Sequence, residues 1–237
     1  MINEQLYSLY HSHLAGINAF YDELDAQEVK NYVGPLLPYC WEEHYLQSKY
    51  KLVVIGQETN GWYDDYMRTD EDICEVIEYT KNFELGRKYN SPFWRKSHEF
   101  NSDLNGFDDM NFIWMNINKF GKPLEPGAPD QRVLDAEVKH YNIIAEELSI
   151  FKPDVCLFFT GPNYDSDIQR KISDVSFHKM GDYNLNQLAR LSSAHLPMRS
   201  YRTYHPGYGY RINDVYKGIL GVILEECKLS ARDPLEW

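Results

Sequence analysis

Apolar and polar residues follow a helical pattern over the first part of the chain. Between residues 3 and 30 the apolar side chains recur at the three- and four-residue spacing of one helix face, which predicts an amphipathic helix. Two prolines within Gly34–Pro38 interrupt helical hydrogen bonding, and a short helix is expected over Trp41–Gln47. We therefore expect an amino-terminal helical segment, residues 1–48, packed on the rest of the protein.

A different pattern, short unbroken apolar runs, predicts four β-strands. Such runs are typical of parallel strands that are buried on both faces. They cover Lys51–Ile55, Phe112–Ile117, Val155–Phe159 and Ser200–Tyr204. Helical spacing follows or separates them over 70–85, 91–104, 130–150, 185–191 and 213–229. Alternating strands and helices predict an α/β protein, a three-layer α/β/α sandwich around a mainly parallel four-stranded sheet. Without repeats or a linker, residues 1–237 are expected to form a single domain.

Polar and unusual residues follow each of the four predicted strands. In α/β proteins with parallel sheets, ligands bind beyond the carboxyl ends of the strands. The four segments are Gln57–Trp62, Asn116–Lys119, Gly161–Asn163 and His205–Tyr208. Because these strand ends meet at one edge of the sheet, we expect the segments to form one pocket.

The charge balance limits how the protein meets nucleic acid. The 24 Lys and Arg residues against 36 Asp and Glu residues give a net charge of −12. Broad DNA binding requires a basic footprint, so this balance counts against it while leaving room for a local basic rim. Candidate phosphate contacts near the predicted mouth, for which scattered surface charges are the alternative, are Arg68, Lys119, Lys122, Arg202 and Arg211.

Cysteines and histidines give no metal-binding pattern. The four cysteines are far apart, and none belongs to a CxxC pair. His11 and His13 are two residues apart and so do not share a helix face. We expect no metal, no cofactor and reduced thiols. The longest apolar runs, such as 218–224, are too short to cross a bilayer, so a cytoplasmic monomer without a membrane partner is expected.

Three of the strand-end segments together resemble a known family. Gly56-Gln57-Glu58 follows the first strand, Asn116 ends the second, and His205-Pro206-Gly207 follows the last. In this order they resemble the strand-end motifs of the uracil-DNA glycosylase superfamily, over roughly residues 50–210. Two departures from the family pattern are evident. Glu58 and Thr59 stand where an Asp-Pro pair is usual, and Gly207 stands where a serine is usual.

The resemblance implies a hydrolase of DNA base-excision repair. Its partner would be DNA containing uracil or another damaged base, which is flipped out before the N-glycosidic bond is cleaved. Glu58 would act as a general base or as the electrostatic partner of a cationic sugar, and His205 would donate to a base carbonyl oxygen. Asn116 would bind the edge of the base, with help from the Gln57 backbone. Trp62 or Tyr63 would stack on the base.

Each of these residues has a structural alternative. Gly56 fits a tight turn, Glu58 a helix cap or a solvated position, and Asn116 a structural hydrogen bond. The pair His205-Pro206 fits a strand stop, and Trp62 fits a loop packed on the core. On the scale of the protein, two alternatives to an enzyme are open: a module that binds a nucleobase or nucleic acid without cleaving it, and an acidic protein that holds a protein partner in its cleft.

Overall fold

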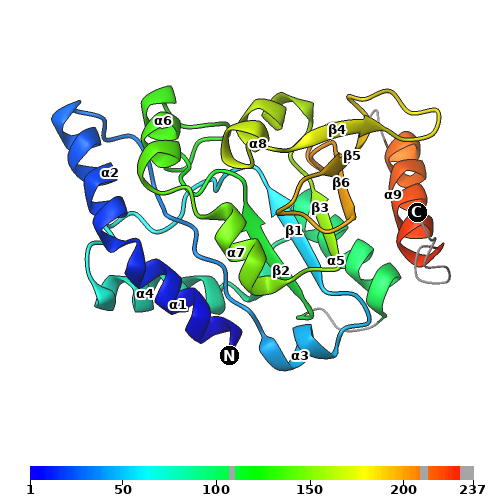
Figure 1. Ribbon diagram of the computed structural model, residues 1–237, viewed down its shortest axis with the longest axis horizontal. Coiled ribbons are helices and arrows are strands. Elements are labelled where there is room, and N and C mark those ends of the chain that lie inside the picture. The colour runs from blue at the N-terminus through cyan, green and yellow to red at the C-terminus, as the bar shows by residue number, and fades with distance from the viewer. Residues whose placement is uncertain (107–109, 209–212, 230–237) are drawn as a thin grey trace.

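The computed structural model describes residues 1–106, 110–208 and 213–229, which form one mixed sheet with helices on both faces (Figure 1). The described residues contain a six-stranded sheet in the order β2-β1-β3-β6-β5-β4. Four strands run parallel: β1 (Leu52–Gly56), β2 (Phe112–Asn116), β3 (Val155–Phe158) and β6 (Arg199–Thr203). The antiparallel strands β5 (Leu188–Ser192) and β4 (Ser176–Lys179) extend the sheet beyond β6.

The prediction of an α/β protein and of its four parallel strands is confirmed, but the prediction of a four-stranded sheet is wrong. The helix predicted over 185–191 is also wrong, because this segment leads into β5. Leu188 and Leu191 have helical spacing, yet they are buried in different hydrophobic clusters on opposite faces of the sheet. The apolar spacing of a strand that is buried on both faces was therefore the same as that of one helix face. Strand β4 is an edge strand with largely exposed residues, so it carries no apolar signal.

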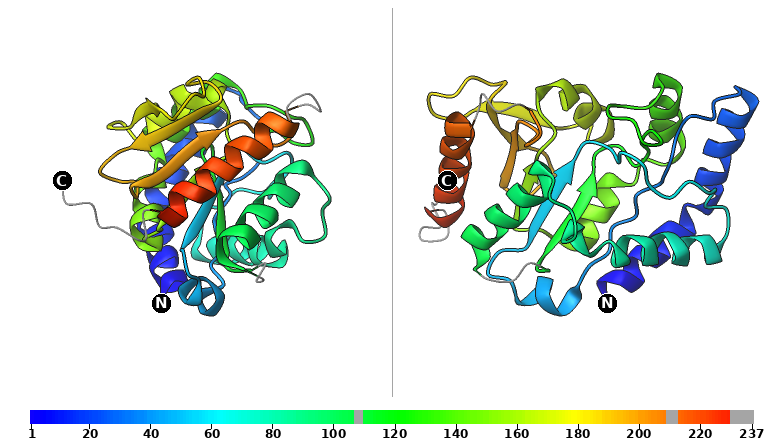
Figure 2. Two further views of the ribbon diagram at one scale, coloured as in Figure 1. Left: turned by 90° about the vertical axis from the view of Figure 1, so that its right-hand side faces the viewer. Right: turned by 180° about the vertical axis from the view of Figure 1, so that it is seen from behind.

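Helices cover both faces of the sheet. The first face carries α1 (Ile2–Ser12), α2 (Leu14–Ala26), α4 (Asp70–Asn82), α6 (Gln131–His140), α7 (Ile144–Phe151) and α8 (Asp165–Lys171). The second face carries α5 (Pro92–Asn105) and α9 (Asn213–Leu229), which lie side by side (Figure 2). Helix α3 (Glu42–Gln47) packs near β2, and two short 3₁₀ segments cover Glu84–Gly86 and Pro162–Tyr164.

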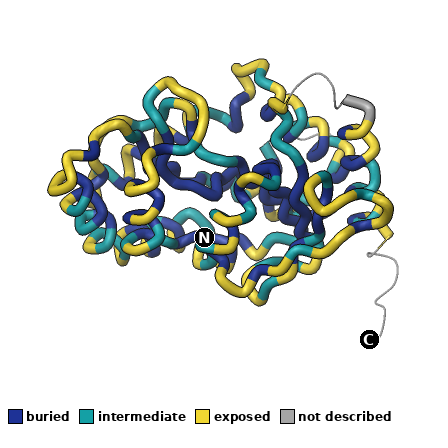
Figure 3. Tube along the Cα trace, turned by 90° about the horizontal axis from the view of Figure 1, so that it is seen from above, coloured by how far each residue is buried: buried dark blue, intermediate teal, exposed yellow. Residues whose placement is uncertain are grey.

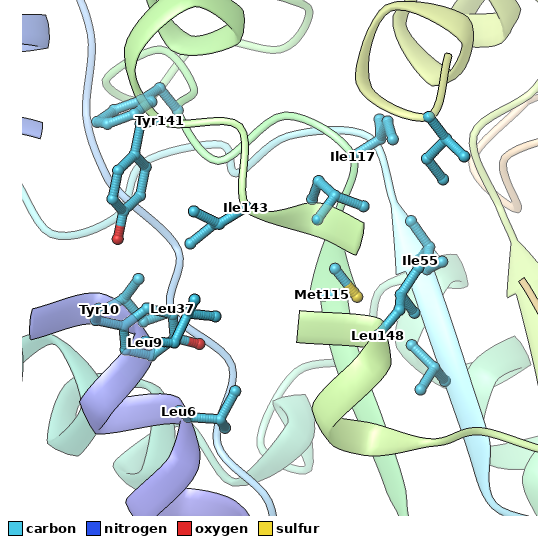
Figure 4. Packing of buried hydrophobic residues seen from close by; sticks show 14 of the residues in the cluster. Leu6, Leu9, Tyr10, Leu37, Ile55, Met115, Ile117, Tyr141, Ile143 and Leu148 are labelled. Carbon is cyan, nitrogen blue, oxygen red and sulfur yellow. The ribbon is translucent and has the colours of Figure 1, made fainter. Parts of the chain in front are cut away.

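Two helices predicted as continuous are each divided in two. The predicted helix over 3–30 breaks at His13, and the one over 130–150 breaks between α6 and α7. The second break has a packing reason. Tyr141 and Ile143, in the connection, are both fully buried and point into the core beside Tyr10 and Leu37 (Figure 4). Their burial preserved the apolar spacing through the break, so the sequence pattern did not reveal it.

The core consists of two hydrophobic clusters separated by the sheet. Along β1, Val53 and Ile55 belong to the cluster of the first face, while Leu52 and Val54 belong to the cluster of the second. The central strands are therefore buried on both sides, and exposed residues lie at the periphery (Figure 3). Helices α1 and α2 pack on α7 and α6 respectively. Among the described residues, no helix is both long and apolar enough to span a membrane.

Candidate active site

A cleft of about 470 Å³ lies at the carboxyl ends of the parallel strands. Its walls include the loop after β1, the end of β2, the start of α5 and His205, which lies two residues after β6. The pocket predicted at the strand ends thus unites three of the four expected segments. The lining residues are Gly56, Gln57, Glu58, Thr59, Asn60, Gly61, Trp62, Tyr79, Phe83, Tyr89, Ser91, Phe93, Trp94, Trp114, Asn116 and His205.

Gly56 allows the cleft to form at the junction of β1 and β2. The two strands are in register, so that Gly56 lies opposite Asn116. A Cβ atom at Gly56 would lie 2.4 Å from the Asn116 Oδ1 atom and 3.3 Å from the Phe93 ring. Since such a contact is too short for any side chain, glycine is needed here for close approach.

Glu58 is a largely buried carboxylate with one free oxygen. Its Oε1 atom accepts a hydrogen bond of 2.8 Å from the Tyr164 hydroxyl. Its Oε2 atom is buried and has no hydrogen-bond partner within the described part of the chain. Burial raises the pKa of Glu58, and this effect outweighs the opposite effects of Tyr164 and Asn118. The alternative role as a helix cap is excluded, because α4 is capped by Thr69.

The buried ammonium group of Lys171 lowers the pKa of Glu58. The Lys171 ammonium donates hydrogen bonds to Asn118 Oδ1 at 2.8 Å, to the Ile117 carbonyl at 2.7 Å and to the Glu137 carboxylate. Because the amide oxygen of Asn118 faces Lys171, its NH₂ group is available to Glu58, and both Asn118 and Lys171 favour the charged form of that carboxylate. None of these supporting residues was predicted from the sequence.

Asn116 offers a hydrogen-bond donor that the protein leaves unused. The side chain is buried, and its Oδ1 atom accepts from the Trp114 indole N–H at 3.2 Å. The Nδ2 atom is buried without a partner among the residues described. An unsatisfied buried amide costs free energy, so such a group is usually paired, and Asn116 lines the cleft.

His205 is held as a neutral imidazole with a defined tautomer. Its ring lies parallel to Phe93, with centroids 5.6 Å apart. Burial lowers the pKa of His205 to about 4. The Gly207 amide donates to Nδ1 at 3.1 Å, which assigns the proton of the neutral ring to Nε2. Pro206 joins the two residues and does not itself line the cleft.

Aromatic rings form most of the remaining wall. Trp62 packs edge-on against Trp114, with centroids 5.3 Å apart, and it also contacts Phe83 and Tyr79. The structure does not bring Tyr63 into the cleft. Its hydroxyl donates to Glu75 at 3.1 Å, and its ring packs on the core of the first face. The aromatic residues of the wall that come from α4, α5 and β2 were not predicted from the sequence.

Gln57 has a structural partner. Its side-chain amide donates to the Thr160 carbonyl oxygen at 2.6 Å, and its own carbonyl oxygen accepts from the Asn118 amide at 3.0 Å. It therefore ties the loop after β1 to the ends of both neighbouring strands. Gly161, in the fourth predicted segment, does not line the cleft.

Most cations expected at the mouth are engaged elsewhere. Lys119 is fully buried and forms an ion pair with Glu147 at 2.5 Å, and Arg202 is buried against Asp165 at 2.7 Å. The prediction that Lys119 and Arg202 contact phosphate at the mouth is therefore wrong. Each is a long side chain near a strand end that points inward to a buried or partly buried carboxylate. Of the others, Arg68 pairs with Asp22 at 2.9 Å, Lys122 lines a separate hollow, and Arg211 lies outside the described residues.

The described residues contain no group of three or more His, Cys, Asp or Glu side chains that could hold a metal ion. The cleft is lined by carboxylate, amide, imidazole and aromatic side chains. The fold and this site define a three-layer α/β protein with an aromatic-lined cleft at the carboxyl edge of its sheet. No protein-family model matches the sequence, and no curated protein matches it either.

Proposed function

We propose that the cleft binds a flipped-out nucleobase and that the protein hydrolyses the N-glycosidic bond of uracil or another deaminated base in DNA. The family that the strand-end motifs resemble, the uracil-DNA glycosylase superfamily, performs this reaction. One observation carries the proposal: Glu58, Asn116 and His205 all line one aromatic cleft, and Glu58 Oε2 and Asn116 Nδ2 are buried without a hydrogen-bond partner among the described residues.

These three groups match the charges that develop during the reaction. As the bond between the base and C1′ breaks, its electron pair leaves with the base, and the sugar becomes cationic. The Glu58 carboxylate stabilises that cation and accepts a proton from the water that attacks C1′. The Nε2–H group of His205 donates to the oxygen of the departing base, which becomes negative, and Asn116 Nδ2 donates to a second acceptor. Such interactions are strongest where the reacting groups are shielded from water.

Release of uracil from a single strand containing one deoxyuridine tests the proposal. Glu58→Gln keeps the hydrogen bond from Tyr164 but removes the negative charge, and His205→Phe keeps the stacking on Phe93 but removes the donor. Each substitution should lower kcat by roughly 10²-fold or more, the cost usual for loss of a group that stabilises the transition state.

Glu71→Gln, an exposed carboxylate at the start of α4, is the matched control and should leave the rate unchanged. Rates unaffected by either cleft substitution would contradict the roles assigned to Glu58 and His205. A panel of damaged bases with no release from any of them would contradict the enzyme itself.

The second candidate is a module that binds a nucleobase without cleaving it. The net charge of −12 favours it, since an acidic protein gains little from general DNA contacts. Calorimetry with uracil distinguishes the two candidates. Binding that is lost in Asn116→Ala, together with no base release from DNA, would identify the module.

A further inference from the structure

A second, basic hollow adjoins the cleft. It has a volume of about 320 Å³ and lies between the 86–90 loop and the first two turns of α5. Tyr89 and Trp94 line both the hollow and the cleft, so the two spaces share a wall. The lining residues are Gly86, Arg87, Lys88, Tyr89, Asn90, Trp94, Arg95 and His98.

The segment from Gly86 to His98, which lines the hollow, has a charge opposite in sign to that of the whole chain. Between Gly86 and His98 the sequence has four cationic residues and no acidic residue, in a protein with a net charge of −12. Arg87, Lys88 and Arg95 are exposed. The ion pair of Lys88 with Glu84, at 3.3 Å, lies on the surface, where such a pair contributes little. Lys88 and Arg95 are therefore accessible to an incoming anion, whereas Lys119, Lys171 and Arg202 are buried in ion pairs.

The loop that carries Arg87 and Lys88 is fixed against α5. Glu84, Leu85 and Gly86 all have positive φ angles, of 51°, 50° and 66°. A Cβ atom at Gly86 would lie 2.2 Å from the Trp94 ring, so the backbone packs directly on that ring. The His98 Nε2 atom lies 2.9 Å from the Leu85 carbonyl oxygen and bonds to it. The cations of the loop and Arg95 of α5 are thereby held around the same space.

Tyr89 lies on the wall between the cleft and the basic hollow. Its side chain is exposed, and its ring is stacked on Phe83 with centroids 4.8 Å apart. A tyrosine supported from below in this way presents its outer face to a neighbouring base, and base–aromatic stacking is a common mode of single-strand binding.

From these features we propose that the basic hollow binds a backbone phosphate of the single strand whose base enters the cleft, with Tyr89 stacking on the flanking base. The proposal rests on the proposed function only in taking the cleft as the base site. It explains how an acidic protein can hold DNA: phosphate contacts fix the position of the strand, and a few local cations suffice for that.

The test compares two double variants of equal charge. Lys88→Gln with Arg95→Gln removes two cations of the hollow. Lys49→Gln with Lys152→Gln removes two exposed cations near the starts of β1 and β3, at the opposite edge of the sheet. Fluorescence anisotropy gives the Kd of a labelled six-nucleotide single strand with one deoxyuridine, measured at several salt concentrations.

Each phosphate contact adds about 0.7 to the slope of log Kd against log salt for a single strand. We expect the hollow variant to bind more weakly and to lose roughly 0.7 from this slope, the value for the one phosphate that the hollow holds. The control should keep the slope of the unmodified protein. Equal slopes for the two double variants, at unchanged Tm, would overturn the proposal.

The outcome separates this proposal from the proposed function. A reduced slope without base release from any substrate would leave the phosphate site standing and remove the enzyme. Base release with an unchanged slope would support the enzyme and overturn the phosphate site. A free nucleotide carries the same phosphate chemistry, so deoxyuridine monophosphate is measured in parallel. Weakening confined to that nucleotide would identify a nucleotide site and overturn the assignment to a strand.

Discussion

The protonation states of Glu58 and His205 are properties of their surroundings rather than of their residue types. Burial moves the two pKa values in opposite directions, upward for the carboxyl group and down to about 4 for the imidazole. At neutral pH the histidine is therefore a neutral donor in the cleft that Glu58 also lines. This combination suits a reaction in which the sugar becomes positive and the base negative.

A pH–rate profile tests this pair of shifts. The rate requires the Glu58 carboxylate, whose pKa lies above its usual 4.5, while His205 gains a proton only near pH 4. As the pH falls, kcat/KM should therefore first decline through protonation of Glu58, at a pH above 4.5. Glu58→Gln should abolish this decline, leaving a low rate that is flat over the same range. A decline centred near pH 6.5 that survives in Glu58→Gln would instead assign the titration to a histidine of ordinary pKa.

Some residues of the site could be predicted from the sequence, and others could not. Glu58, Asn116 and His205 could be predicted because each follows a buried strand, and parallel strands place their carboxyl ends together. Phe93, which lines the cleft, and Tyr164, which bonds to Glu58, could not be predicted, because they come from helical segments whose packing depends on distant parts of the chain. The same holds for the inward turn of Lys119, whose partner Glu147 lies 28 residues further along the chain.

At the level of elements, a buried ion pair joins the loop after β2 to α7 and α1. Lys119, in the loop after β2, donates to both carboxylate oxygens of Glu147 on α7, at 2.6 and 2.5 Å. The hydroxyl of Tyr10 on α1 donates to the same carboxylate at 3.0 Å. Both charged side chains are fully buried, so the carboxylate depends on these partners for its stability.

Removal of one partner should therefore cost more than removal of both. Lys119→Met leaves the Glu147 carboxylate buried without its cation and should destabilise the protein by roughly 3–5 kcal/mol. Adding Glu147→Met removes the isolated charge and should recover part of that loss. Urea unfolding of the two variants measures the difference. If Lys119→Met changes the free energy of unfolding by less than about 1 kcal/mol, the ion pair does not hold these elements together.

The elements that the sequence predicted well are those whose burial is uniform. Strands β1, β2 and β3 are buried on both faces, so their apolar runs are unbroken. The β4–β5 hairpin was missed because one strand is exposed and the other carries leucines for both faces. An apolar pattern reports burial, and burial alone does not distinguish a two-faced strand from one helix face.

At the level of the whole molecule, two segments next to the cleft lining differ in charge. The basic segment 86–98 contributes Tyr89, Phe93 and Trp94 to the lining, and the cleft loop 56–62 is followed along the chain by the exposed pair Asp64 and Asp65. The net charge of −12 repels a nucleic acid at long range, so the local asymmetry decides on which side a strand can approach.

This asymmetry predicts the effect of neutralising one acidic residue at the mouth. Asp64→Asn removes an exposed negative charge two residues beyond the cleft lining and should raise the association rate of the six-nucleotide probe roughly twofold at low salt. The gain should shrink as salt shortens the Debye length to about 8 Å near physiological ionic strength. Glu43→Gln, an exposed residue of α3, makes the same change in net charge near β2 and away from the cleft lining. Stopped-flow anisotropy should show a smaller gain for this control. Equal gains for both variants would mean that the net charge alone, and not its distribution around the cleft, governs the encounter with DNA.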